Sequence, residues 1–136
     1  AGTAAAHALQ YPVGNLTHTA HGLGVATLLP FVMQYNRPAC ANALAELADA
    51  IGVGDGPAEA RAQAFIDAVS DLLARIDIPA SLAALGLAAD QQDYVARHSL
   101  DAARLIKNNP RPLDLAAMQS ITRAAFTGDR ASLSAL

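Results

Sequence analysis

The chain has 136 residues, of which 53% are hydrophobic and 15% are charged, and its formal net charge at pH 7 is −3. It has no cluster of basic residues, which excludes the electrostatic surface expected of a nucleic-acid-binding protein. The longest apolar run, from Leu23 to Met33, is interrupted by Pro30 and falls short of the roughly 18 residues that a membrane-spanning helix needs.

Alanine dominates the hydrophobic residues, aromatic residues make up only 4%, and tryptophan is absent. Alanine is the best helix former and its small side chain lets helices approach closely. No segment shows the alternation of apolar and polar residues that is typical of a half-buried strand. We therefore predict an all-α fold, a single domain built as a bundle of about six helices.

The start of the chain leads us to expect a piece of a longer protein. Residues 1–6 read as the middle of a small-residue helix, without a start methionine or a capping residue ahead of His7. No charged segment followed by an apolar one marks a signal peptide. The single cysteine, Cys40, cannot form an internal disulfide, which fits a cytoplasmic protein.

The first predicted helix runs from Thr3 to Tyr11 or Val13. Pro12 lacks a backbone N–H, so it should weaken only the last turn. Gly14 is expected to close the helix as its C-terminal cap, because glycine adopts the left-handed conformation that such caps need. The chain should then turn back at this point.

The second predicted helix, residues 21–35, is apolar on every face and should therefore be buried. Thr17 or Thr19 is expected to cap its first turn through a side-chain oxygen. Pro30 removes one backbone hydrogen bond and should kink the helix. Residues 36–38 should end it and begin a third helix, with the proline at the first helical position.

A third helix is predicted from Pro38 to Ile51 and a fourth after Pro57. The loop between them, residues 52–56, is rich in glycine, but it lacks the GxGxxG spacing and follows a helix, so we reject phosphate binding there. The apolar positions expected to face inward recur at helical spacing: Ala39, Ala43, Leu44, Leu47, Ala48 and Ile51 in one helix, and Ala64, Phe65, Ala68, Val69, Leu72, Leu73 and Ile76 in the other.

A short turn should follow, capped by Ser81 and closed by Gly86. The fifth predicted helix is capped by Asp90 and reaches about Ile106. Its inward positions are expected to be Tyr94, Val95, Ala102 and Leu105.

Residues 108–112 form a predicted loop, because proline disfavours a helical conformation in the residue before it. Asp114 should cap a sixth helix, residues 115–126. The tail after Gly128 is expected to be frayed.

The best candidates for chemistry are His7 and His21, which lie on either side of the first predicted turn. A divalent metal needs several side chains that converge on one point, usually with neutral imidazoles among them. A helix–turn–helix can bring two such rings together. The spacing is not a recognised metal motif such as HExxH, however, so packing roles for both histidines stay open as the alternative.

Three further residues could belong to the same site. Tyr11 lies one helical turn after His7 on the same face, where it could donate a hydrogen bond to a substrate oxygen near the metal or simply belong to the core. His18, in the turn, could be a third ligand or point to solvent, and His98 is expected to be an ordinary surface or half-buried histidine. The aspartates lie on faces expected to be solvated and are not placed to complete the site: Asp49, Asp67, Asp71 and Asp101.

The segment from His7 onward resembles the second signature of the iron-containing (group III) alcohol dehydrogenases. That pattern is a histidine, about ten small and apolar residues with a glycine, then HG and an apolar helix ending in LPxVxxxN. The matching residues are His7, Gly14, His21-Gly22 and LPFVMQYN at positions 29–36. IPASL at 78–82, LGL at 85–87 and NPRPL at 109–113 also have counterparts in order, so the resemblance covers nearly the whole chain.

The resemblance implies a C-terminal helical domain whose N-terminal α/β domain, which binds NAD or NADP, is missing. In the family one Asp and three His hold an Fe²⁺ or Zn²⁺ ion in the cleft between the domains, and His7 and His21 match the last two of these ligands. Many members have another histidine where this chain has Tyr11, so a proton relay through that position is not carried over.

The implied reaction interconverts a small alcohol and an aldehyde or ketone: the metal polarises the carbonyl while the nicotinamide exchanges hydride. The fragment alone should be inactive. Its expected partners are the missing domain, the substrate and, as one option, further copies in a homo-oligomer. Two competing hypotheses are a standalone helical interaction domain with structural histidines and, more weakly, a metal-carrier module.

Overall fold

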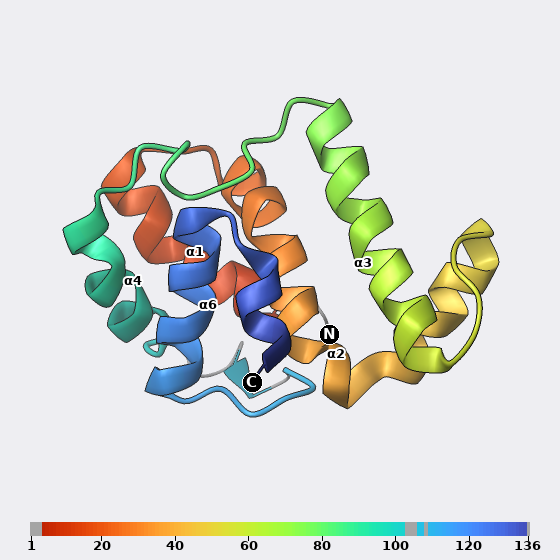
Figure 1. Cartoon of the computed structure of the whole chain (residues 1–136). Coiled ribbons are helices and arrows are strands. Elements are labelled where there is room, and N and C mark those ends of the chain that lie inside the picture. Colours follow the sequence, from red (N-terminus) through yellow and green to blue (C-terminus); the bar gives the residue numbers. More distant parts are fainter. Residues whose placement is uncertain (1–3, 103–105, 108, 136) are drawn as a thin grey trace.

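The computed structural model describes residues 4–102, 106–107 and 109–135, and all regular structure among them is helical (Figure 1). The predicted all-α fold is confirmed. A long helix, α2, forms the spine: α1 and α6 pack against its first half, α4 packs on α1 and α6, and α3 packs along α2 on the other side. Within the described residues, no helix is long and apolar enough to cross a membrane.

Helix α1 spans Ala4–Thr17 and passes through Pro12 and Gly14, so the predicted cap at Gly14 was wrong. The helix ends instead at His18, which adopts a left-handed conformation with φ of 56°. The backbone N–H of His18 still donates to the carbonyl of Gly14, at 2.8 Å. The glycine is therefore a packing residue inside the helix and not its terminus.

Helix α2 spans His21–Ile51 as one element of 31 residues, so the predicted break at residues 36–38 was misplaced. The backbone leaves the helical conformation later, at Cys40, where φ is −136° and ψ is 28°. Pro38 supplies no N–H to the preceding turn, which weakens the helix just ahead of this bend. The yellow half of α2 turns away from the orange half at this bend (Figure 1).

The start of α2 is also capped differently from the prediction. Ala20 is the N-cap residue, and no side chain among the described residues bonds the free N–H groups of the first turn. The hydroxyl of Thr17 donates to the carbonyl of Val13 at 2.8 Å and is also hydrogen-bonded to the hydroxyl of Thr19. Both threonines therefore stabilise the end of α1 and the turn, which leaves the N-terminus of α2 open.

Helix α3 spans Ala58–Arg75 and packs almost entirely against α2. Ala62 and Ile66 are its buried residues and form a small second core with Met33 and Leu44. Among the described residues α3 packs mainly against α2, so the buried stripe that these two helices share is narrower than predicted. Several predicted inward residues are more than 40% exposed: Leu47, Ile51, Leu72 and Ile76.

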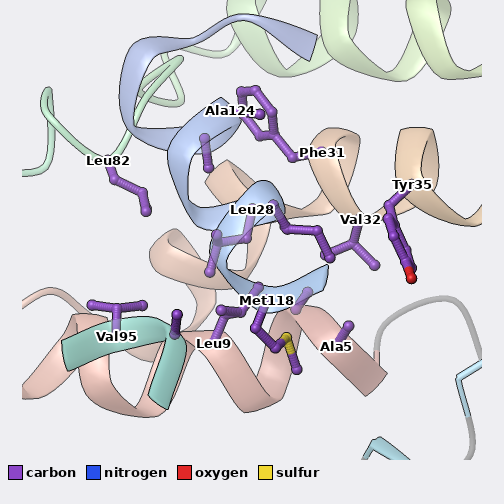
Figure 2. Close-up of a cluster of buried hydrophobic side chains, with 14 of the residues drawn as sticks. Ala5, Leu9, Leu28, Phe31, Val32, Tyr35, Leu82, Val95, Met118 and Ala124 are labelled. Carbon is purple, nitrogen blue, oxygen red and sulfur yellow. The ribbon is translucent and has the colours of Figure 1, made fainter. Parts of the chain in front are cut away.

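The main core lies between α1, the first half of α2, α4 and α6. Leu9, Leu28, Val95 and Met118 are fully buried there and point toward one another from different helices (Figure 2). Figure 2 also places Leu82, from the loop after α3, against the same cluster. The first half of α2 is thus buried on most of its circumference, as its apolar sequence predicts.

Helix α4 spans Gln92–Ser99 and follows a short 3-10 turn, η1, at Ala89–Gln91. The predicted cap at Asp90 was wrong, because Asp90 lies within η1 and Gln91 is the N-cap residue of α4. Val95 is buried as predicted, whereas Tyr94 is 44% exposed. The predictions for Leu105 and for a helix through residues 103–105 lie outside the described residues.

Helix α6 spans Leu115–Thr127, and its ends were predicted correctly. The carboxylate of Asp114 accepts from Ala117 N at 2.8 Å, and Gly128 closes the helix in the left-handed conformation. The turn capped by Ser81 is also confirmed, since its hydroxyl accepts from Ala84 N at 3.1 Å. Side-chain caps and positive-φ glycines are local devices, which explains why sequence alone could find them.

The tail after α6 is ordered as a second 3-10 helix, η2, Arg130–Ala135, so the predicted fraying was wrong. Leu133 is 2% exposed and belongs to the main core. The guanidinium of Arg130 donates to Asp67 at 3.0 Å, and Ser134 accepts from the buried amide of Gln34. One apolar anchor and two polar contacts therefore hold the tail against α2 and α3.

The LPxVxxxN motif has a structural role at the middle of α2. The amides of Asn36 and Asn109 exchange two hydrogen bonds, of 3.0 and 2.7 Å. Tyr35 donates to the carbonyl of Pro112 at 2.6 Å, and Arg111 lies over its ring, 4.2 Å from the centroid. Burial raises the pKa of the Tyr35 hydroxyl, which keeps it protonated as a donor. The motif thus ties the loop before α6 to the spine.

We predict that Leu133→Ala lowers the free energy of unfolding by about 2–5 kcal/mol, because it removes a fully packed leucine from the core. Leu72→Ala in α3 is the matched control: this leucine is 56% exposed, and its loss should change stability by less than about 0.5 kcal/mol. Urea unfolding of the chain measures both. Equal effects of the two substitutions would mean that the tail does not dock.

A second prediction concerns the bend in α2. The Cys40 thiol is half-buried, and it donates to the carbonyl of Asn36 at 3.2 Å. Burial raises the pKa of the thiol, so at a given pH a smaller fraction of Cys40 is present as the reactive thiolate. Alkylation by iodoacetamide at pH 8 should be at least about tenfold slower in the native chain than in urea. Similar rates in both states would exclude this environment for the thiol.

Candidate metal centre

The structure brings together His7, near the start of α1, and His21, the first residue of α2. Nδ1 of His7 lies 3.1 Å from Nε2 of His21, and the ring centroids are 5.1 Å apart. The rings are nearly parallel, with 21° between their planes. In the absence of an ion this distance is a hydrogen bond, with the donor set by the tautomers.

The two rings meet because of how α1 and α2 pack. His7 lies near the start of α1 and His21 is the first residue of α2, and the rings are in contact where these helices pack against each other. The connection between the two helices is held by the left-handed His18 and the Thr17–Thr19 hydrogen bond. The two helices can approach closely beyond the turn because Gly14 and Gly24 have no side chains.

The pair has the dimensions of two ligands to one ion. Zinc binds imidazole nitrogen at about 2.0–2.1 Å, so two nitrogens of a tetrahedral site lie roughly 3.3 Å apart. The nitrogens of His7 and His21 that face each other are 3.1 Å apart, so the two rings would need to move only slightly to bind a shared cation. Imidazole suits iron as well as zinc. Across the part of the chain that the structure describes, His, Cys, Asp and Glu form no group of three that could hold a metal, so further ligands would come from elsewhere.

Tyr11 lies beside this pair. Its ring centroid is 5.8 Å from that of His21, with 36° between the planes, and its side chain is 54% exposed. It is therefore not a core tyrosine, the alternative that the sequence left open. The exposed hydroxyl end is free to meet a molecule that approaches the two histidines.

The other two histidines lie apart from the pair. His18 is exposed in the turn, where its backbone adopts a left-handed conformation. His98 packs on Tyr94, with ring centroids 3.9 Å apart, and its Nδ1 lies 3.4 Å from a carboxylate oxygen of Asp101. His98 is thus the surface histidine that the sequence predicted.

One feature was not found from the sequence. Tyr11 and Asn15 of α1 line a surface hollow together with Tyr94 and His98 of α4 and the neighbouring Asp101. The hollow therefore adjoins the His7–His21 pair through Tyr11. No local pattern could have indicated it, because it depends on how α4 packs against α1.

The remaining candidate carboxylates serve other purposes. Asp49 forms an ion pair with Arg61, and Asp67 forms one with Arg130. Asp71 is exposed on α3. These groups lie on α2, α3 and their surroundings, so the expectation that they do not complete the site agrees with their positions.

Comparison with known proteins identifies the family of the chain. The profile of the Fe-containing alcohol dehydrogenase family, C-terminal, matches residues 1–126. The chain is 34% identical over 131 residues to long-chain-alcohol dehydrogenase 1 of Geobacillus thermodenitrificans (strain NG80-2), covering 94% of this chain and 33% of that protein.

Two solved structures share the fold. A 1,3-propanediol oxidoreductase has a TM-score of 0.81 at 29% identity, covering 90% of this chain and 32% of that one. The alcohol dehydrogenase from Oenococcus oeni has a TM-score of 0.80 at 26% identity, covering 89% and 32%. The chain thus spans about a third of the length of the relatives that it matches. We conclude that this chain belongs to the iron-containing alcohol dehydrogenase family and corresponds to its C-terminal helical domain.

Proposed function

We propose that this chain is the helical, metal-binding domain of an NAD(P)-linked alcohol dehydrogenase, with His7 and His21 as two of the metal ligands. The observation that carries the proposal is the 3.1 Å separation of the facing ring nitrogens in a chain of this family. A packing role alone would not require two imidazoles to face each other at an exposed helix end.

The ion is Fe²⁺ or Zn²⁺, and a preceding segment of the longer protein supplies the other ligands. When bound, it acts as a Lewis acid on the oxygen of the alcohol or carbonyl substrate. The residues of this chain hold one side of that site: His7 from α1 and His21 from the first turn of α2. His21 is exposed, so this face is open to the domain that would carry NAD or NADP.

Tyr11 is the residue of this chain placed to contact the substrate. It stands one helical turn from His7 and beside the His21 ring, with more than half of its side chain exposed. A phenolic hydroxyl there donates a hydrogen bond to the substrate oxygen and so orients it toward the site. The substrate is a small alcohol or the corresponding aldehyde or ketone. The isolated chain has no dehydrogenase activity, because it holds neither the remaining ligands nor the cofactor.

The ligand assignment predicts the behaviour of single variants of the full-length enzyme. His7→Ala and His21→Ala should each weaken metal binding by more than about 100-fold, because even outer residues of metal sites contribute 10–100-fold. Activity should fall with metal content. Metal analysis after dialysis and steady-state kinetics measure the two effects.

His18→Asn is the control for these variants. It removes the neighbouring exposed histidine, and asparagine tolerates the positive φ of that position. Metal content and activity should stay at the level of the unaltered enzyme. If His7→Ala or His21→Ala retained both metal and activity, that residue would not be a ligand.

A separate prediction tests Tyr11. Tyr11→Phe keeps the ring and removes only the hydroxyl, so metal content should not change. The catalytic efficiency, kcat/KM, should fall by about three- to tenfold, the scale of one hydrogen bond. Unchanged kcat/KM for alcohol and aldehyde would exclude a substrate contact, and loss of the metal would instead assign the hydroxyl to the metal site.

A further inference from the structure

The side chain of Gln10 fills the space at which α1 and α2 cross. It is 2% exposed, although glutamine is a long polar residue. A Cβ added to Gly24 of α2 would lie 1.5 Å from Oε1 of Gln10, and one added to Gly14 of α1 would lie 2.7 Å from Nε2. Both distances are shorter than real Cβ contacts, so an alanine at either position would displace the buried carboxamide from this conformation.

This fit differs from ordinary hydrophobic packing. Oε1 of Gln10 is buried and has no hydrogen-bond partner among the described residues. A buried acceptor without a donor is unfavourable, and such a group calls for an explanation. The oxygen lies over Gly24 near the N-terminus of α2, where the positive end of the helix dipole partly compensates it.

The location of this contact relates it to the proposed metal site. Gln10 follows His7 by three residues in α1, and Gly24 follows His21 by three residues in α2. Residues three apart lie on one face of a helix, about one turn from each other. The contact between Gln10 and Gly24 therefore lies one turn from both imidazoles and fixes the separation of the two helices beside them.

We propose that Gln10 is a positioning residue: its carboxamide, seated over Gly24, sets the spacing of α1 and α2 that holds the ring nitrogens of His7 and His21 at a metal-binding distance. This inference rests on the proposed function for its role in metal binding. The fit between Gln10 and Gly24 stands independently of it. Gln10 does not touch the metal or the substrate and acts only through the two helices.

The test is a double-mutant cycle in the full-length enzyme, with Gly24→Ala, Gln10→Ala and the combined variant. The measurements are Co²⁺ affinity, the visible absorption spectrum of the Co²⁺ form well below the melting temperature, and Tm. The control is Gly22→Ala, where an added Cβ meets no described atom within 4 Å. Alanine in place of a helical glycine normally raises stability, so Gly22→Ala should keep or raise Tm.

Gly24→Ala should lower Tm and weaken Co²⁺ binding by about tenfold or more, the scale known for residues that orient metal ligands. Gln10→Ala should shift the Co²⁺ spectrum, because the ligand pair is no longer held. The combined variant should recover Tm relative to Gly24→Ala, since the added methyl group then has room, but it should keep the altered Co²⁺ spectrum of Gln10→Ala, because the carboxamide is still missing. If Gly24→Ala does not fold, Gln10→Ala and the combined variant still decide the matter.

Two results would overturn the proposal: Gly24→Ala matching the unaltered enzyme in Tm and Co²⁺ binding, or a combined variant with no recovery of Tm relative to Gly24→Ala. Changes in Tm without any change in Co²⁺ affinity or spectrum would also overturn it, because Gln10 would then only stabilise the fold. Failure of the proposed function is recognised separately. In that case His7→Ala and His21→Ala would leave Co²⁺ binding intact, while the Tm cycle would still report on the fit of Gln10 against Gly24.

Discussion

The close crossing of α1 and α2 is the contact on which the rest of the structure depends. It exists because Gly14 and Gly24 have no side chains and because the buried carboxamide of Gln10 occupies the space they leave. The crossing also brings the His7 and His21 rings together, with Nδ1 of His7 at 3.1 Å from Nε2 of His21. It also leaves the other faces of α2 to be covered by α3, α6 and the tail, which together bury the spine of the domain.

Much of the helical structure could be predicted from the sequence, because it depends on local signals. Asp114 caps α6 and Gly86 closes the turn that Ser81 caps, and both were predicted correctly. Gly14 was misread because a glycine that permits helix contact looks the same in sequence as one that ends a helix. The exposed stripe on α3 and the docked tail were missed for a related reason: the number of neighbours that cover an element is decided by the tertiary fold.

The candidate site could also be predicted only in part from the sequence. Two histidines across a turn, with the HG and LPFVMQYN segments, were enough to indicate the family and the pair of interest. The ring geometry, the exposure of Tyr11 and the hollow that it shares with α4 require the packed structure. Gln10 offered no signal, since a glutamine within a helix normally indicates a solvated position. The structure also gives Asn36 of the motif a purely structural partner, Asn109.

We propose that this domain carries part of a metal site: two imidazoles held where α1 and α2 cross, on a face that would meet the cofactor-binding domain. A crystal structure of the full-length enzyme grown with Zn²⁺ tests this most directly. The account predicts one ion with a ring nitrogen of His7 and one of His21 each at about 2.0–2.1 Å. An ion bound away from these two rings, with the rings still hydrogen-bonded to each other, would contradict it.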